Sequence, residues 1–164
     1  MRLHMRALRG VIVLVLVLVL AACGPSAGLE TGAESYNRGD YATALIEFRP
    51  LAEQGDAQAQ ALLGTMYMNG KGVARDYAEA AKWFHLAAEQ GQDLAQFSLG
   101  TMYVYGLGVT LDYVQAHKWY SLAALRSSGE DRDEAASNRD DVEAKMSPDQ
   151  VAEAQRLARE WKPK

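Results

Sequence analysis

The sequence has few of the residues on which catalytic and cross-linked folds depend. Its one cysteine, Cys23, cannot form an internal disulfide. Of its three histidines, His4 lies in the amino-terminal segment that is typical of a removed export signal. His85 and His117 alone are fewer than the three protein ligands usual for catalytic zinc. No glycine-rich phosphate loop follows a predicted strand, and no serine stands in a nucleophile-elbow context. The sequence therefore predicts no catalytic residues, no metal site and no cofactor.

Positive charge is also scarce once the amino-terminal segment is set aside. Residues 1–22 carry three of the 17 basic residues and none of the 21 acidic ones. The remainder holds 14 basic against 21 acidic residues, a net charge of −7. Such an acidic body lacks the electrostatic footprint of a nucleic-acid-binding protein and does not attract anionic lipid headgroups. The sequence therefore predicts no nucleic acid among the partners, and attachment to a membrane would require a lipid.

Residues 1–22 are typical of an export signal. Arg2, Arg6 and Arg9 precede a purely apolar run over residues 11–22. As a helix this run would be about 18 Å long, well short of a hydrocarbon core of about 30 Å. Residues 1–22 are therefore predicted to be a signal peptide, and a stable membrane-spanning helix is the weaker alternative. Ordinary cleavage after a small residue, giving a soluble exported protein, is the alternative to lipid attachment.

The run ends in Leu20-Ala21-Ala22-Cys23, which resembles the lipobox of bacterial lipoproteins. The resemblance implies that Cys23 becomes the acylated first residue of the mature protein, and more than one acyl chain is needed for firm anchoring. Gly24, by resemblance to enterobacterial sorting signals, implies the periplasmic leaflet of the outer membrane. Residues 23–32, which include the stretch GPSAG, are predicted to be the lipidated N-terminus and a flexible tether.

The rest of the chain is dominated by an internal repeat. The segment GTMYMNGKGV begins at Gly64, and the similar segment GTMYVYGLGV begins 36 residues later at Gly100. Between residues 59–88 and 95–124, 18 of 30 positions are identical. A fixed period of this length is typical of a repeat array, in which each unit is one supersecondary motif.

Each unit predicts two helices joined by a turn. After Asp76, a natural N-cap, apolar residues recur every three or four positions up to Ala88. The preceding helix runs from about Asp56 to Met68 and stops at glycine. Gly64 and Gly100 fall inside helices, where glycine costs about 1 kcal/mol relative to alanine. Close approach of Trp83 or Trp119 is the expected compensation, and both indoles are predicted to be core. The prediction is an all-α, α-hairpin repeat solenoid.

These motifs resemble the Sel1-like repeat, a relative of the tetratricopeptide repeat. The pattern is carried by Leu63-Gly64, Tyr67, Gly70-x-Gly72-Val73, Asp76, Ala80, Trp83 and Ala87-Ala88, and it returns 36 residues later. The resemblance covers residues 33–127. The first unit departs from it, because Glu47 replaces the tryptophan and the first helix, near residues 34–38, is short. Residues 128–164 are predicted to be C-terminal capping helices, the second beginning with a capping box at Ser147 and Gln150.

Comparison of the two units predicts where a partner binds. Positions identical in both units are those that the hairpin requires, and positions that differ are free of that demand. In tetratricopeptide-like arrays the first helix of each pair lines the concave surface, so we expect the differing positions there to form a stripe. The predicted partner-binding residues are Gln58, Ala61, Met68, Asn69, Leu94, Phe97, Val104 and Tyr105, which differ between the units, together with Thr101, which does not. The alternative is that Phe97 is core beneath the C-terminal helices and Trp161. The acids from Glu130 to Glu143 are interpreted as a solvated face.

The resemblance implies a non-enzymatic scaffold for protein–protein interaction, with a protein or peptide partner. A periplasmic module that binds a peptide, through groups such as Asn69 and Gln60, or a glycan, through exposed aromatic rings, is the alternative. Some Sel1-like proteins have been labelled β-lactamases, but their repeats carry paired cysteines. No repeat of this sequence contains a cysteine, so a β-lactamase-like hydrolase is the weakest alternative.

Overall fold

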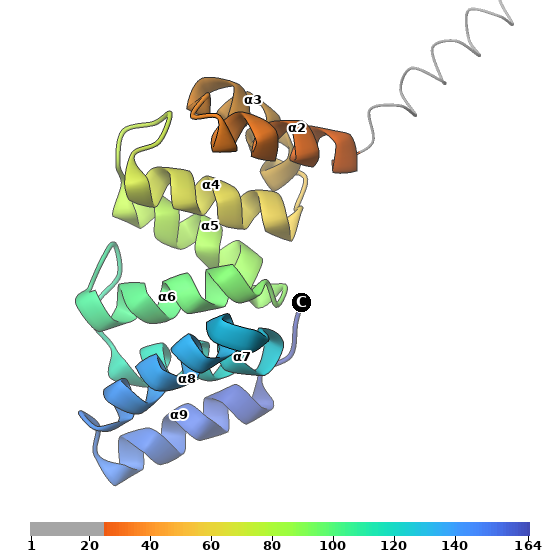
Figure 1. Ribbon diagram of the computed structural model, residues 1–164. Coiled ribbons are helices and arrows are strands. Elements are labelled where there is room, and N and C mark those ends of the chain that lie inside the picture. The colour runs from red at the N-terminus through yellow and green to blue at the C-terminus, as the bar shows by residue number, and fades with distance from the viewer. Residues whose placement is uncertain (1–24) are drawn as a thin grey trace, which may run out of the picture.

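A computed structural model describes residues 25–164; the predicted signal peptide and Cys23 lie outside this range. The described chain is all helical (Figure 1). The order is α2 (Pro25–Asn37), α3 (Tyr41–Glu53), α4 (Ala57–Asn69), α5 (Tyr77–Glu89), α6 (Asp93–Tyr105), α7 (Tyr113–Arg126), α8 (Gly129–Glu143) and α9 (Pro148–Glu160). The all-α, hairpin-repeat fold predicted from the sequence is confirmed.

Helices pack as successive antiparallel pairs that stack along one direction (Figure 1). The pairs are α2 with α3, α4 with α5, and α6 with α7, and each pair rests on the next. Both α8 and α9 pack on α7, so they close the array. Acidic N-caps fix several helix starts: Asp76 accepts a hydrogen bond from the backbone of Glu79, and Asp112 does the same for Gln115. The predicted capping box of Ser147 and Gln150 is present at α9.

The amino-terminal part of the fold corrects the predicted tether. Helix α2 begins at Pro25, so residues 25–32 are helical and the first helix is far longer than the predicted 34–38. The glycines that suggested flexibility serve close packing instead. A Cβ on Gly32 would lie 2.4 Å from the ring of Phe48, a fully buried residue of α3, and Gly28 faces Leu51 of the same helix. Without side chains at these positions, α2 can lie directly on α3.

The glycines inside α4 and α6 also mark close contacts, but the partners differ from those predicted. A Cβ on Gly64 would lie 2.9 Å from the ring of Phe84, and one on Gly100 would lie 2.6 Å from the ring of Tyr120. The expected partners were the adjacent residues Trp83 and Trp119. Trp119 is only 1% exposed and lies in the central core, whereas Trp83 is half-buried at the edge of a neighbouring cluster.

The turn within each hairpin packs on the preceding hairpin. A Cβ on Gly72, in the α4–α5 turn, would lie 2.7 Å from the carbonyl oxygen of Tyr41, the first residue of α3. A Cβ on Gly108, in the α6–α7 turn, would lie 2.2 Å from the carbonyl oxygen of Tyr77, the first residue of α5. The same contact thus recurs 36 residues later. It sets the spacing between successive hairpins.

The carboxyl end of the chain folds back along the array. The guanidinium of Arg126 lies 5.0 Å from the ring centroid of Trp161, just after α9. The backbone nitrogen of Lys164 donates to the carbonyl oxygen of Glu89, and its ammonium pairs with the Glu89 carboxylate at 3.0 Å. The segment after α9 therefore joins the last helix to α5 (Figure 1).

Candidate functional site

The predicted partner-binding stripe is divided between surface and interior. Leu94 is 44% exposed and Tyr105 is 70% exposed, and Gln58 and Asn69 are also exposed. Met68, Phe97, Thr101 and Val104 are half-buried. Ala61 is fully buried in the core between α4 and the helices around it, so it cannot touch a partner. The function of this stripe in binding stays a prediction.

The residues proposed to read a peptide backbone are engaged within the fold. Gln60 is buried, its amide nitrogen donates to the carbonyl oxygen of Ala52, and its side-chain oxygen accepts from Gln90. The Asn69 amide donates to the carbonyl oxygen of Thr65 within α4. Gln60 therefore has no free surface to offer, and Asn69 is committed to its own helix.

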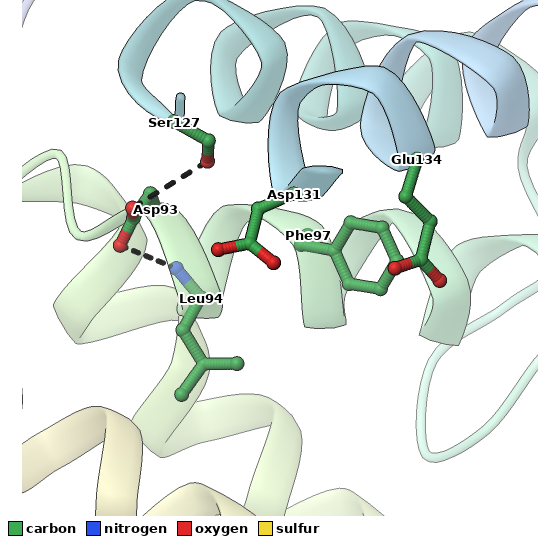
Figure 2. A pocket seen from close by; sticks show the side chains of 6 residues that line it. All are labelled: Asp93, Leu94, Phe97, Ser127, Asp131 and Glu134. Atoms are coloured by element: carbon green, nitrogen blue, oxygen red, sulfur yellow. Dashed lines mark hydrogen bonds between the residues drawn. The ribbon is translucent and has the colours of Figure 1, made fainter. Parts of the chain in front are cut away.

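A cleft opens between α6 and α8 at one end of the stripe. Its volume is about 240 Å³. Leu94 and Phe97 come from α6, Asp131 and Glu134 come from α8, and Ser127 lies in the segment between α7 and α8 (Figure 2). Asp93, in the first turn of α6, completes the lining. The cleft thus combines an apolar floor with three carboxylates.

Phe97 is held in place mainly by Tyr120 of α7, a residue outside the predicted stripe. Its ring meets that of Tyr120 edge-on, with centroids 5.4 Å apart. The Tyr120 hydroxyl and Thr101 Oγ1 are hydrogen-bonded at 2.9 Å, and burial raises the pKa of Tyr120. Phe97 and Val104 pack against a cluster that contains Val142 of α8. Phe97 therefore forms the floor of the cleft, while Trp161 packs against a different cluster.

The carboxylates of the cleft differ in how they are held. Asp93 accepts hydrogen bonds from the backbone nitrogen of Leu94 at 2.8 Å and from the hydroxyl of Ser127 at 3.4 Å (Figure 2). Asp131 and Glu134 are exposed, and between residues 25 and 164 they form no ion pair. These two residues belong to the acidic run, from Glu130 to Glu143, that is predicted from the sequence to be a solvated face. Because α8 lies outside the repeats, comparison of the repeat units could not predict that these two residues lie beside Phe97.

One group of three residues resembles the serine–histidine–carboxylate arrangement of hydrolases, and the sequence did not predict it. Ser121, His117 and Glu143 form a chain in which His117 Nε2 lies 2.9 Å from a Glu143 oxygen and Ser121 Oγ lies 3.4 Å from Nδ1. The serine hydroxyl, however, donates to the His117 carbonyl oxygen at 2.8 Å, so its proton is directed to the backbone. The His117 side chain is buried. The arrangement ties α8 to α7 and thereby holds one wall of the cleft.

Removal of the Glu143 carboxylate tests this tie. We expect Glu143→Ala to lower the free energy of unfolding by about 1–3 kcal/mol, because it leaves a ring nitrogen of buried His117 without its partner. Glu143→Gln keeps an oxygen that can accept from the ring and is expected to cost less than Glu143→Ala. Urea unfolding of the three proteins gives the comparison. Equal losses in both variants would show that His117 does not depend on this acceptor.

The described residues contain no group that could hold a metal ion by three or more histidine, cysteine, aspartate or glutamate side chains. None of the helices from α2 to α9 has the length and apolar character needed to span a bilayer. What this part of the molecule offers is a stack of hairpins with an accessible cleft. Stacked α-hairpins with this geometry define the tetratricopeptide-like class of helical repeat scaffolds.

Comparison with known proteins places the chain within this class. The Sel1 repeat profile matches residues 57–92 and 93–128. A Sel1 repeat protein from Oxalobacter formigenes is 30% identical, with a TM-score of 0.61, over 65% of this chain and 85% of that one. A protective antigen of uropathogenic Escherichia coli, described as having an SLR fold, is 34% identical, with a TM-score of 0.79, over 87% of this chain. The chain belongs to the Sel1 repeat family.

The chain spans only 30% of the length of the Escherichia coli antigen. Among curated proteins, no sequence matches the chain significantly. The first matched unit begins at Ala57 and the second at Asp93, and the second ends just before Gly129. Each unit therefore comprises one helix pair and its turns. The family therefore accounts for α4 to α7, and the cleft is made where the last matched unit meets α8.

Proposed function

We propose that this protein is a non-enzymatic scaffold that binds a protein partner through the α6–α8 cleft. The observation that carries the proposal is an accessible apolar floor, Leu94 and Phe97, inside a rim of polar groups. Aromatic and aliphatic anchors within a polar rim are typical of interaction hot spots. Tyr105, at the other end of α6, is a further exposed aromatic side chain outside the cleft.

The proposal includes a lipid anchor at Cys23 in the periplasmic leaflet of the outer membrane. It rests on the resemblance of Leu20-Ala21-Ala22-Cys23 to a lipobox and on Gly24 after it. Replacement of residues 1–23 by the signal peptide of a soluble exported protein removes both Cys23 and the apolar run of residues 11–22. It is expected to move the protein from the membrane fraction to the soluble fraction, because none of the described helices is long and apolar enough to span a membrane. An unchanged membrane association in this variant would overturn the anchor.

Photo-cross-linking in cells tests the interaction surface. A photoreactive amino acid at Leu94 samples the cleft and leaves the packing of Phe97 on Tyr120 intact. Leu86 on α5 is the matched control, because it is an exposed leucine, at 51%, that does not line the cleft. We expect one discrete protein adduct from position 94 and none from position 86. The absence of any adduct at position 94, or the same adducts at both positions, would contradict the scaffold proposal.

A glycan-binding module is the second candidate, and the exposed ring of Tyr105 favours it. An aromatic ring on the surface can stack on a sugar, whereas the peptide-reading role of Gln60 has lost its support. The same experiment separates the two candidates. A glycan ligand yields no cross-linked protein at position 94, whereas a protein partner does.

A further inference from the structure

We infer that the α6–α8 cleft receives a lysine or arginine side chain of the partner. The inference rests on the proposed function, because it names the chemistry that the same cleft recognises. It follows from three features of the described residues: the size of the cleft, its apolar floor, and the sign of the charges around it.

The size of the cleft suits one long side chain. Its volume of about 240 Å³ lies below the roughly 300–1,000 Å³ of pockets that enclose drug-sized ligands. The floor is formed by the half-buried ring of Phe97 and the exposed side chain of Leu94. Lysine and arginine carry an apolar stem below a charged head, and the stem packs on apolar surface while the head stays among polar groups. A floor of this kind therefore accommodates the stem.

The charges around the floor match a cationic head. Asp131 and Glu134 stand three residues apart on α8, so they share one face of the helix, and Figure 2 shows both carboxylates on the side of α8 that faces α6. Asp93 adds a third carboxylate from α6. The charges in this lining are all negative.

The nearest cations along α8 are engaged elsewhere. Arg132 pairs with Asp133, and Arg139 pairs with Asp140, each with its neighbour on the same helix. Within the described chain no lysine, arginine or histidine forms an ion pair with Asp93, Asp131 or Glu134. The cleft therefore presents carboxylates whose charge a partner can complement. A membrane surface or a phosphate group would instead be repelled by them.

A small-molecule titration tests this inference independently of the partner's identity. The probe is N-acetyl-arginine amide, added to the full chain in detergent, and the matched neutral probe is N-acetyl-citrulline amide, which has nearly the same shape without the charge. NMR chemical shifts of Leu94, Phe97 and Asp131 report binding. We expect the arginine probe to shift these signals with an affinity about fivefold higher than the citrulline probe, the effect of about two exposed ion pairs. The difference should shrink as salt is added.

Variants of α8 provide the second arm. Asp131→Asn combined with Glu134→Gln removes the two carboxylates and keeps the shape of the cleft, and it should abolish the preference for the arginine probe. Glu130→Gln combined with Asp141→Asn makes the same change in net charge on the same helix outside the lining, and the preference should persist.

Equal shifts from the two probes, no shifts from either, or an unchanged preference in the Asp131/Glu134 variant would each overturn the cation inference. The scaffold proposal is judged separately, by the adduct at position 94. If that adduct forms in cells and survives Asp131→Asn with Glu134→Gln, the cleft binds a protein but does not depend on a cationic side chain. If the arginine preference is found but no adduct forms, the cation site stands and the scaffold proposal fails.

Discussion

Replacing Gly108 by alanine is expected to lower the free energy of unfolding by about 3 kcal/mol. The residue has φ +67°, a left-handed conformation that costs a residue with a Cβ about 1–2 kcal/mol. The new Cβ would also lie 2.2 Å from the carbonyl oxygen and 2.6 Å from the next backbone nitrogen at the start of α5. These are backbone atoms, so relief requires a shift between two hairpins. Urea unfolding followed by circular dichroism measures the loss.

Gly39 is the matched control for this prediction. It has φ +82°, in the turn between α2 and α3, and a Cβ there would meet nothing within 4 Å. Gly39→Ala should therefore show only the conformational part, about 1–2 kcal/mol. If the two variants lose the same stability, the contact between the α6–α7 turn and α5 does not hold the repeats together, and the explanation given for the spacing of hairpins is wrong.

Truncation of Trp119 to alanine is expected to cost about 3–5 kcal/mol, the range for deleting a large buried aromatic side chain. Trp119 is 1% exposed and belongs to the core shared by α5, α6 and α7. The ring of His85 meets its indole edge-on at 6.0 Å, and the ammonium of Lys118 lies 3.9 Å from its ring centroid. Thermal or urea unfolding gives the measurement.

Trp83 is the control for Trp119, because it occupies the same position in the preceding unit. It is half-buried, so Trp83→Ala should cost clearly less than Trp119→Ala. A milder change, Trp119→Phe, also separates packing from polarity. The Trp119 indole nitrogen has no hydrogen-bond partner in the described part of the chain, so its removal should cost little beyond the lost volume. A loss as large in Trp119→Phe as in Trp119→Ala would point to a partner for this nitrogen.

The repeat made the helix pairs predictable from the sequence. A 36-residue period with Asp76 and Asp112 at helix starts leaves little choice of architecture, because each unit alone cannot bury its apolar face. The pattern was less informative about which neighbour meets a glycine. Adjacent residues on a helix differ by about 100° in direction, and the repeat contains an aromatic pair, so its period alone does not tell which ring faces the glycine. The prediction of Trp83 was wrong, because Phe84 is the ring that faces Gly64.

Only the α6 side of the candidate cleft could be predicted from the sequence. Leu94 and Phe97 were found because they differ from Gln58 and Ala61 in the preceding unit. Asp131 and Glu134 were not, since the relative placement of α6 and α8 is a tertiary property that no local spacing encodes. Ala61 was wrongly included in the exposed stripe, because it is fully buried. A position can differ between two units when the residues packed around it also differ, so a difference does not by itself indicate exposure.

The start of α2 at Pro25 bears on how high above a membrane the protein would work. Only Gly24 separates Cys23 from this helix, and one extended residue spans at most about 3.6 Å. An acylated Cys23 would therefore hold the first helix pair close to the bilayer surface, because only one residue separates the cysteine from α2. Since the pairs stack in chain order and α6 belongs to the third pair (Figure 1), the length of the stack would limit how far the α6–α8 cleft can lie from the bilayer.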